Sequence, residues 1–350
     1  MKNSVITEDL EDIIKYDLNW QAMAGKTVLI AGANGFLPAY LVETLLHLND
    51  SWHKEPVKVI AVVRNREKAL RRFSDYVGRN DLQLIVQDIC QPLEIDGPID
   101  YIIHAASQAS PKYYGKDPVG TLSANILGTY NLLELARAKQ VMSFLFFSSG
   151  EVYGEVGADQ IPTREDVYGY LDPLDVRSCY AESKRMGENM CVCWHHQHGV
   201  PAKIVRPFHT YGPGLDLNDG RVFADFVSDI VHCRNIVMKS DGSASRAFCY
   251  LSDATIGFFL VLLHGKNAEA YNVGNDEGEV SVLELANVMI GLFPEKKLQV
   301  IRKSEVLSED YLKSKITRNC PDIAKISALG WKPVVSVADG FKKTVRSFML

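Results

Sequence analysis

The sequence predicts an α/β protein built on a doubly wound parallel sheet, followed by a smaller C-terminal domain. From Lys26 to about Arg206, short apolar runs rich in β-branched residues alternate with longer segments of helical period, which is the pattern of a parallel sheet covered by helices. The first apolar run passes into a glycine-rich turn, and this turn opens a helical pattern. That order of strand, turn and helix is typical of Rossmann-type folds.

The strands of the sheet are expected in five segments. Each is a short apolar run bounded by polar residues, glycine or proline. These runs are residues 27–31, 57–63, 82–86, 101–105 and 142–148. Leucines at helical spacing follow the first run, and further helices are predicted at 121–140 and 180–198.

A change in composition after Arg206 marks the expected domain boundary, because proline and glycine become more frequent there and the predicted elements become shorter. We expect an N-terminal extension at 1–24 with no assigned role and a dinucleotide-binding domain at 25–206, with a return segment around 245–275. The second domain would comprise 207–244 and 276–350. Within it, Ser281 and Glu284 form a capping-box pattern that predicts a helix start, and a last helix is predicted at 337–350.

Composition limits the function classes. With 350 residues, 47% of them hydrophobic, the chain can bury a full core. Its formal net charge of −5 gives no global attraction to nucleic acid or to an anionic membrane. We see no export leader and no apolar run near the roughly 20 residues that span a bilayer, so we expect a cytoplasmic protein. Seven scattered cysteines predict free, mostly buried thiols.

The glycine turn is the first candidate binding site. Gly32 and Gly35 stand where a side chain would block a pyrophosphate from the helix N-terminus; an ordinary tight turn is the alternative. Pro38 replaces the third glycine of the pattern and is compatible with a first helical turn. The residues of this turn expected to bind a dinucleotide are Gly32, Asn34, Gly35, Phe36 and Leu37.

The residues after the second strand bear on the choice of dinucleotide. A carboxylate normally binds the ribose of NAD here, whereas this chain has Arg64 and Arg66. A guanidinium pairs well with a 2′-phosphate, so we predict NADP(H), with NAD still possible. A solvated helix start with ordinary surface charges is the alternative. Asp88, just past the third strand, is placed either for the adenine edge or to cap the following turn.

A phenol and an ammonium group form the candidate catalytic pair. Tyr180 and Lys184 lie one helical turn apart on one face of a predicted helix. An ammonium group beside a phenol lowers the pKa of the phenol, so the tyrosine can serve as general acid or base for a carbinol or carbonyl oxygen. Ser149 follows the fifth strand, at the sheet edge where ligands bind in this fold class, and its hydroxyl is placed to bind the same oxygen.

Two other groups of side chains are candidates for a metal site or a ligand contact. Helical spacing scatters the histidines and cysteines of residues 191–198 over several faces, so no metal site is predicted. Tyr113 and Tyr114 either stack on a ligand or seal a cleft.

Together these motifs resemble the extended short-chain dehydrogenase/reductase family, the NAD-dependent epimerases and dehydratases. The resemblance rests on the glycine turn, on Ser149, Tyr180 and Lys184, and on residues 206–213, and it covers the chain from about Lys26. Within the family, the segments 104–111, 177–180, 218–222 and 246–250 are most similar to UDP-glucuronate decarboxylases. The resemblance implies a dinucleotide-binding domain with a smaller domain that binds a sugar nucleotide, usually in a homodimer.

The resemblance also implies roles for individual residues. Tyr180 would be the base, Lys184 would bind the nicotinamide ribose, and Ser149 and Glu151 would orient the sugar. Asn125 would support a proton relay, with a plain buried amide as the alternative. Further cofactor contacts would be Ile89, Ala105 and Ala106, and the substrate contacts would be Ser107, His209, Arg221 and Arg246.

Three departures from the family bear on the reaction. Gly150 stands where the decarboxylases carry serine and the 4,6-dehydratases carry aspartate, so neither a hydroxyl nor an acid is available there. Arg64 replaces an acidic residue, and a preference for NADPH suits a net reduction. His209 replaces an asparagine that contacts the diphosphate.

These departures favour an NADPH-dependent reductase acting on the 4-keto group of a nucleotide-activated 4-keto-6-deoxyhexose, such as dTDP-4-dehydro-6-deoxyglucose. Tyr180 would protonate the C4 alkoxide, and the resemblance implies a role in surface polysaccharide and O-antigen biosynthesis. The alternative is a redox-neutral UDP-glucuronate decarboxylase or sugar-nucleotide 4-epimerase with tightly bound NAD. A sensor that binds the cofactor without catalysis is the third hypothesis.

Overall fold

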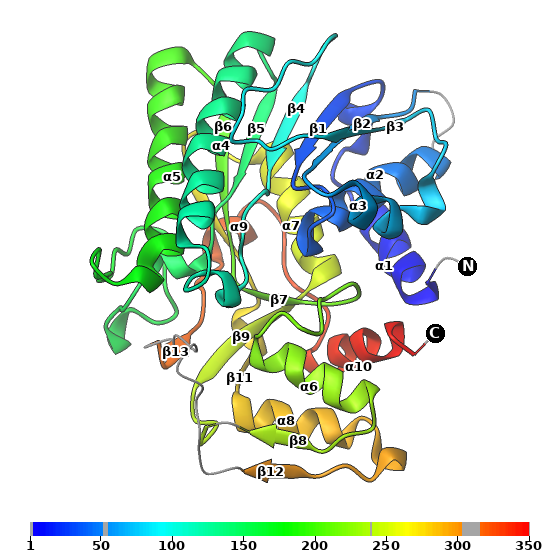
Figure 1. Cartoon of the computed structure of the whole chain (residues 1–350), viewed down its shortest axis with the longest axis vertical. Helices are drawn as coiled ribbons and strands as arrows, with labels where there is room; N and C mark the ends of the chain where they lie inside the picture. The colour runs from blue at the N-terminus through cyan, green and yellow to red at the C-terminus, as the bar shows by residue number, and fades with distance from the viewer. Residues whose placement is uncertain (1–2, 52–54, 239, 303–315, 350) are drawn as a thin grey trace.

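The chain folds around one large parallel sheet. The computed structural model describes residues 3–51, 55–238, 240–302 and 316–349. Seven parallel strands lie in the order β10-β6-β5-β4-β1-β2-β3 (Figure 1). Their bounds are β1 Thr27–Ala31, β2 Lys58–Val63, β3 Leu82–Val86, β4 Tyr101–His104, β5 Ser143–Phe147, β6 Ala202–Pro207 and β10 Ala270–Val273. The predicted fold class is confirmed; β1 to β5 are the five predicted strands, whereas β6 and β10 lie outside those predictions.

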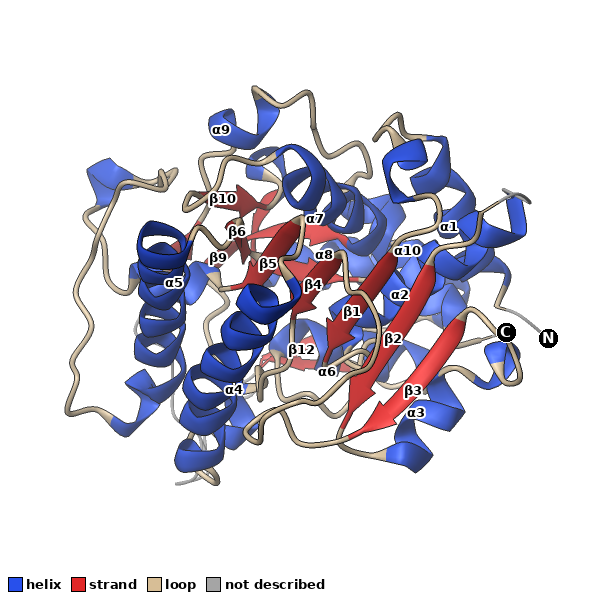
Figure 2. Ribbon diagram, turned by 90° about the horizontal axis from the view of Figure 1, so that it is seen from above, coloured by secondary structure: helices blue, strands red, loops and turns tan. Residues whose placement is uncertain are grey.

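Helices cover both faces of this sheet. α4 (Pro118–Lys139) and α5 (Cys179–His198) pack together on one face, and α2 (Phe36–Ser51) and α7 (Leu251–His264) lie on the other (Figure 2). Because both faces are covered, every residue of β1, β4 and β5 is buried, which explains their continuous apolar runs. No described helix is both long and apolar enough to cross a membrane.

A smaller region lies below the sheet in Figure 1. Its strands are β7 His209–Tyr211, β8 Ile236–Met238, β9 Ser245–Tyr250, β11 Glu279–Ser281, β12 Val300–Arg302 and β13 Arg318–Asn319. β9 pairs with β7, β11 and β13, and β8 pairs with β12. Its helices are α6 (Val222–Val231), α8 (Val282–Gly291) and α10 (Val337–Ser347), and the short α9 (Ala324–Ser327) packs against β10. The domain boundaries themselves stay a prediction.

The start of α8 follows the predicted capping box. The Ser281 hydroxyl accepts from the Glu284 backbone N–H at 3.1 Å, and the Glu284 carboxylate accepts from the Ser281 N–H at 2.8 Å. Two orphan donors at the helix N-terminus are thereby satisfied. The predicted helix start is confirmed.

The N-terminal extension forms a helix, α1 (Ser4–Lys15), which packs against α2, α7 and α10. Asp9 of this helix is fully buried and accepts hydrogen bonds from Tyr40 Oη at 3.1 Å and Tyr250 Oη at 2.7 Å. Lys343 of α10 donates to the same carboxylate at 3.0 Å. The extension thus joins a helix of the sheet region to the last helix of the chain.

Candidate active site

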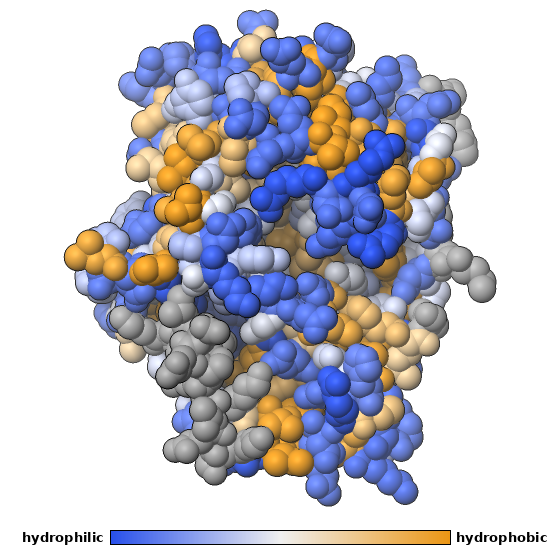
Figure 3. Space-filling model, viewed as in Figure 1, coloured by the Kyte–Doolittle hydropathy of each residue, from blue (hydrophilic) through white to orange (hydrophobic). Residues whose placement is uncertain are grey.

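The large sheet has a topological switch point at β1. Because β1 lies between β2 and β4, a crevice forms beside the carboxyl ends of β1 and β4, where ligands bind in open α/β sheets. A cavity of about 200 Å³ opens there, walled by the first turn of α2, the segments after β4 and β5, α5 and β7. Figure 3 shows this face of the molecule hollowed between the sheet and the smaller region.

The glycine turn forms one wall of the crevice. Gly32 has a φ of +78°, a left-handed conformation that favours glycine, and a Cβ there would lie 2.6 Å from the Ala106 Cα. The turn closes with the Gly35 N–H donating to the Gly32 carbonyl at 2.8 Å, and α2 begins at Phe36. Pro38 lies in the first turn of α2, where its missing N–H leaves no hydrogen bond unmade. A side-chain-free cradle at a helix N-terminus suits a dinucleotide pyrophosphate.

The residues predicted for the adenosine end lie around the strand ends beyond this turn. Arg64 is exposed, and the following helix α3 (Arg66–Arg72) is capped by Asn65, which accepts from the Lys68 N–H at 2.8 Å. Asp88 caps its own turn, accepting from the Cys90 N–H at 2.9 Å. This contact agrees with the turn-cap alternative, and the contact of Asp88 with an adenine edge stays a prediction. Ile89 is buried and fills the space beside Gly128 of α4.

The phenol and the ammonium group meet at the cavity. Tyr180 and Lys184 lie on α5 with both side chains buried and lining the cavity. Lys184 Nζ lies 5.8 Å from the centre of the Tyr180 ring and donates to the Phe147 carbonyl at 2.6 Å. Asn125 of α4 is also buried; its amide donates to Ser183 Oγ at 2.9 Å, which places it against the far side of the same helix turn.

Ser149 and Glu151 lie on the segment that follows β5. The Ser149 hydroxyl accepts from the Glu151 backbone N–H at 3.1 Å and so caps the short helical turn Gly150–Tyr153. Glu151 Oε2 lies 3.5 Å from Arg177 Nη1, just before α5. These contacts hold a hydroxyl and a carboxylate at the cavity wall, next to Tyr180.

Burial shifts the pKa values of both Tyr180 and Lys184. Burial raises the pKa of Tyr180 to about 12, with the Glu151 carboxylate adding to the rise and the Ser149 hydroxyl opposing it. The lowered pKa that the sequence predicted for this phenol is therefore wrong, because burial has the larger effect. Burial also lowers the pKa of Lys184 to about 7, against the opposing charge of Glu188. Two perturbed titratable groups in one cleft are typical of a catalytic site.

Polar atoms without partners mark the substrate end. Ser107 Oγ, His209 Nδ1 and Asn319 Oδ1 belong to cavity-lining residues, are buried, and have no hydrogen-bond partner within the described chain. Because buried polar atoms are nearly always paired, these three mark positions for a polar ligand. Burial and the nearby charges of Arg246 and Arg221 hold the pKa of His209 well below its usual range, so its ring is neutral.

The two arginines predicted to bind substrate are placed differently. Arg221 lines the cavity and pairs with Asp219. The Arg246 guanidinium donates to the carbonyls of Ser245 at 2.7 Å and Ile316 at 2.8 Å, and Arg246 is not among the lining residues. The structure therefore brings Arg221, but not Arg246, to the wall of the cavity. Ala105 lines the cavity, and Ala106 packs under Gly32.

Two lining residues have functions that the sequence left open or unassigned. Tyr114 is buried and stacks on the Tyr180 ring, with centroids 4.9 Å apart and planes 14° apart. Tyr114 therefore supports the Tyr180 ring within the described chain, whereas Tyr113 is 38% exposed. Asn319 reaches the cavity from β13. No sequence signal identifies it, because only the pairing of β13 with β9 brings it there.

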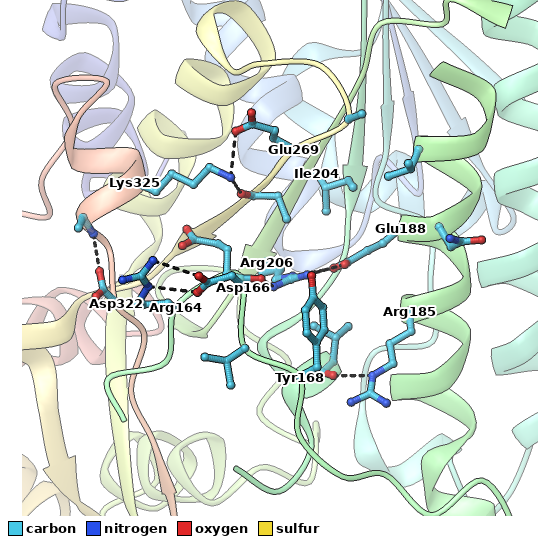
Figure 4. A pocket seen from close by; sticks show the side chains of 18 residues that line it. Arg164, Asp166, Tyr168, Arg185, Glu188, Ile204, Arg206, Glu269, Asp322 and Lys325 are labelled. Carbon is cyan, nitrogen blue, oxygen red and sulfur yellow. Dashed lines mark hydrogen bonds and ion pairs between the residues drawn. The ribbon is translucent and has the colours of Figure 1, made fainter. Parts of the chain in front are cut away.

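A second cavity, of about 880 Å³, lies beside β6 and β10 (Figure 4). Six of its charged side chains form three pairs with N–O distances of 2.6 to 3.0 Å: Arg206 with Glu188, Arg164 with Asp166, and Lys325 with Glu269. None of the catalytic residues predicted from the sequence lines it.

The described cysteines and histidines were also candidates for a metal site. Within the described ranges, no group of three or more His, Cys, Asp or Glu side chains is arranged to hold a metal ion. All seven cysteines are free: Cys179, Cys191, Cys249 and Cys320 are buried, while Cys193 and Cys233 are exposed.

Comparison with known proteins identifies the family. The family model of the NAD dependent epimerase/dehydratase family matches residues 28–274. UDP-glucuronic acid decarboxylase 3 of Arabidopsis thaliana is 32% identical over 325 residues, which are 92% of this chain and 89% of that protein. UDP-glucuronic acid decarboxylase 1 of Danio rerio is 33% identical over 324 residues, 92% of this chain and 72% of that protein.

A solved structure agrees in fold. UDP-glucuronic acid 4-epimerase from Bacillus cereus, in complex with UDP-glucuronic acid and NAD, has a TM-score of 0.74 and 24% identity, covering 92% of this chain and 99% of that one. The fold, the motifs and the family model agree. This chain belongs to the NAD dependent epimerase/dehydratase family and is close in sequence to UDP-glucuronic acid decarboxylases.

Proposed function

We propose that this protein is a redox-neutral nucleotide-sugar enzyme with tightly bound NAD, and that it acts on UDP-glucuronic acid. The observation that carries the proposal is the meeting of Tyr180, Lys184 and Ser149 at one cavity beside the glycine cradle. The decarboxylase relatives support this alternative more than the NADPH-dependent reductase that the sequence favoured. A homodimer, as the resemblance implies, is part of the same proposal.

The chain's own residues supply the proton chemistry at C4. Bound NAD would accept the C4 hydride and later return it, so no cofactor is consumed. Tyr180 takes the proton of the C4 hydroxyl and gives it back at the end. When protonated, the Lys184 amine, 5.8 Å from the Tyr180 ring centre, would favour the phenolate against the burial that raises the pKa of Tyr180. The Ser149 hydroxyl binds the same sugar oxygen, and Glu151, held by Arg177, orients the ring.

Oxidation at C4 prepares the loss of the sugar carboxylate. With a ketone at C4, the C6 carboxylate is that of a β-keto acid: the C5–C6 bond breaks, carbon dioxide leaves, and the electron pair forms an enolate across C4 and C5. A proton then adds at C5 before C4 is reduced. The partnerless atoms of Ser107, His209 and Asn319 would bind the hydroxyl and phosphate groups of the substrate during these steps.

A specific observation favours a second candidate, the NADPH-dependent 4-ketoreductase. A Cβ at Gly150 would lie 3.3 Å from the Phe208 ring, so the wall where the decarboxylases carry serine is apolar here. Arg64 is exposed directly after β2, and a guanidinium there would suit a 2′-phosphate. Both features suit hydride delivery to a neutral 4-keto sugar.

The test begins with the cofactor and ends with the product. The purified protein is denatured and the released dinucleotide identified; native protein is then incubated with UDP-glucuronic acid. Carbon dioxide and a UDP-pentose, with no net change in absorbance of reduced nicotinamide, are the expected result. Epimerised UDP-hexuronate without carbon dioxide would make it a 4-epimerase. Stoichiometric loss of added NADPH with a 4-keto-6-deoxy sugar nucleotide would overturn the redox-neutral proposal.

A further inference from the structure

A buried ion pair beside the catalytic residues has no part in the chemistry above. Glu188 lies one helical turn after Lys184 on α5, and its carboxylate accepts two hydrogen bonds from the Arg206 guanidinium of β6, at 2.8 and 2.6 Å. Only 13% of the Glu188 side chain and 6% of the Arg206 side chain are exposed. Both line the larger cavity, where Figure 4 shows the two charged groups facing each other.

Glu188 also binds the strand end that carries the catalytic serine. Ser148 Oγ donates to Glu188 Oε1 at 2.5 Å, and Lys184 Nζ donates to the Phe147 carbonyl at 2.6 Å. α5 is therefore fastened at two points to the residues that directly precede Ser149. Because Tyr180 lies on the same helix, this fastening sets the separation of the two groups proposed to bind the C4 oxygen.

The charged groups around Lys184 also indicate a role for Glu188. Burial raises the pKa of the Cys191 thiol on α5 and that of Tyr180, and burial lowers the pKa of His104 on β4, so all three groups are uncharged at neutral pH. Arg206, from β6, is already paired with Glu188. Glu188 is thus the carboxylate that opposes the desolvation of the buried ammonium group.

We propose that Glu188 is a positioning residue of the catalytic site, which fastens α5 to the strand end at Ser148 and increases the fraction of Lys184 that is in the ammonium form. The inference rests on the proposed function, because the ammonium group matters for turnover only if Tyr180 exchanges a proton with the sugar. An ion pair that merely stabilised the fold would leave the protonation of Lys184 unchanged.

The first experiment separates the charge of Glu188 from its shape. Glu188→Gln keeps the size of the side chain and an oxygen that can accept from Ser148. We expect its kcat/KM for the nucleotide sugar to be about tenfold below that of the parent protein at pH 7.5 and about twofold below at pH 6.0, because a pKa near 7 falls by about one unit. The same factor at both pH values, or no loss, would overturn the inference.

Two further variants control for the substitution itself. Glu182→Gln removes a carboxylate from the same helix, one that pairs with Arg185 at 3.7 Å, and its kcat/KM stays within about twofold of the parent at both pH values, as is usual for a surface pair. Ser148→Ala removes the hydrogen bond but keeps the charge. It lowers kcat/KM by a similar factor at both pH values, and a pH-dependent loss like that of Glu188→Gln would contradict the assigned roles.

A second measurement does not depend on turnover. Protein labelled with carbon-13 at the lysine ε-carbon is titrated by NMR, and the Lys184 signal is assigned by its absence from Lys184→Arg. The midpoint should lie near pH 7 in the parent protein and about one unit lower in Glu188→Gln. If no UDP-sugar is turned over, the proposed function fails and this titration still decides the inference: an equal midpoint in both proteins overturns it.

Discussion

The two cavities of this protein differ in what their polar groups bind. In the larger one, of about 880 Å³, six of the charged side chains in the wall neutralise one another in three ion pairs. In the smaller one, of about 200 Å³, a lysine is buried with a backbone carbonyl as acceptor, and three polar atoms lack any described partner. Volume therefore does not identify the site. The site is better identified by buried polar groups that lack a partner, because leaving such a group without a hydrogen bond costs free energy unless a ligand supplies the bond.

The largest expected effect breaks the chemistry at the smaller cavity. Tyr180→Phe removes the proposed proton carrier but keeps the ring that stacks on Tyr114. We expect kcat to fall by roughly 10²- to 10⁴-fold, the usual contribution of a general acid–base group, while the amount of dinucleotide that copurifies is unchanged. Steady-state turnover and cofactor content measure both. A variant that retained near-normal turnover would show that another group exchanges the C4 proton.

The second largest effect is expected at the glycine turn, the proposed cradle of the cofactor. Gly32→Ala places a Cβ against Ala106 and strains a φ of +78°; we expect copurified dinucleotide to fall by about tenfold or more, given a strain of about 1–2 kcal/mol plus the clash. Gly78→Ala is the matched control, because Gly78 has a φ of +85° with nothing within 4 Å of its Cβ position. If both variants kept their cofactor, the glycine turn would not be its cradle.

Sequence reasoning reached the parts of the fold and site that depend on local signals. β1, β2, β4 and β5 are buried along all or most of their length and so appear as apolar runs. β3, at the edge of the sheet, is only partly buried, although its run is also apolar. The spacing of Tyr180 and Lys184 follows from one helix. Ser148, Glu188 and Arg206 come from three elements, and only the adjacency of β5 and β6 brings them together. The sequence analysis did not identify Glu188, although its spacing four residues after Lys184 is a signal that could have found it. Asp9 of α1 had none, because its partners are Tyr40, Tyr250 and Lys343, far along the chain.

A smaller effect is expected at Arg64, the residue predicted to distinguish NADP from NAD. If Arg64 pairs with a 2′-phosphate, Arg64→Glu weakens NADP binding about tenfold or more relative to NAD, since one charge-assisted hydrogen bond contributes roughly 1.5–3 kcal/mol. Arg71→Glu, on the exposed side of α3, controls for the change of charge. The ratio of the two dissociation constants, measured by fluorescence of the reduced dinucleotides, decides the point. An equal ratio in all three proteins would assign Arg64 to the solvated surface.

The smallest effect is expected in the larger cavity. Lys325 pairs with Glu269 at 3.0 Å and donates to the Ala270 carbonyl at 2.8 Å, and the two charged side chains are 33% and 38% exposed. Lys325→Met should change kcat/KM by less than about twofold and the free energy of unfolding by less than about 1 kcal/mol, as is usual for partly exposed pairs. Denaturant unfolding and the nucleotide-sugar assay measure these quantities. A tenfold loss of kcat/KM without a loss of stability would mean that the larger cavity also binds a substrate. Ion-paired side chains would then be compatible with a binding site.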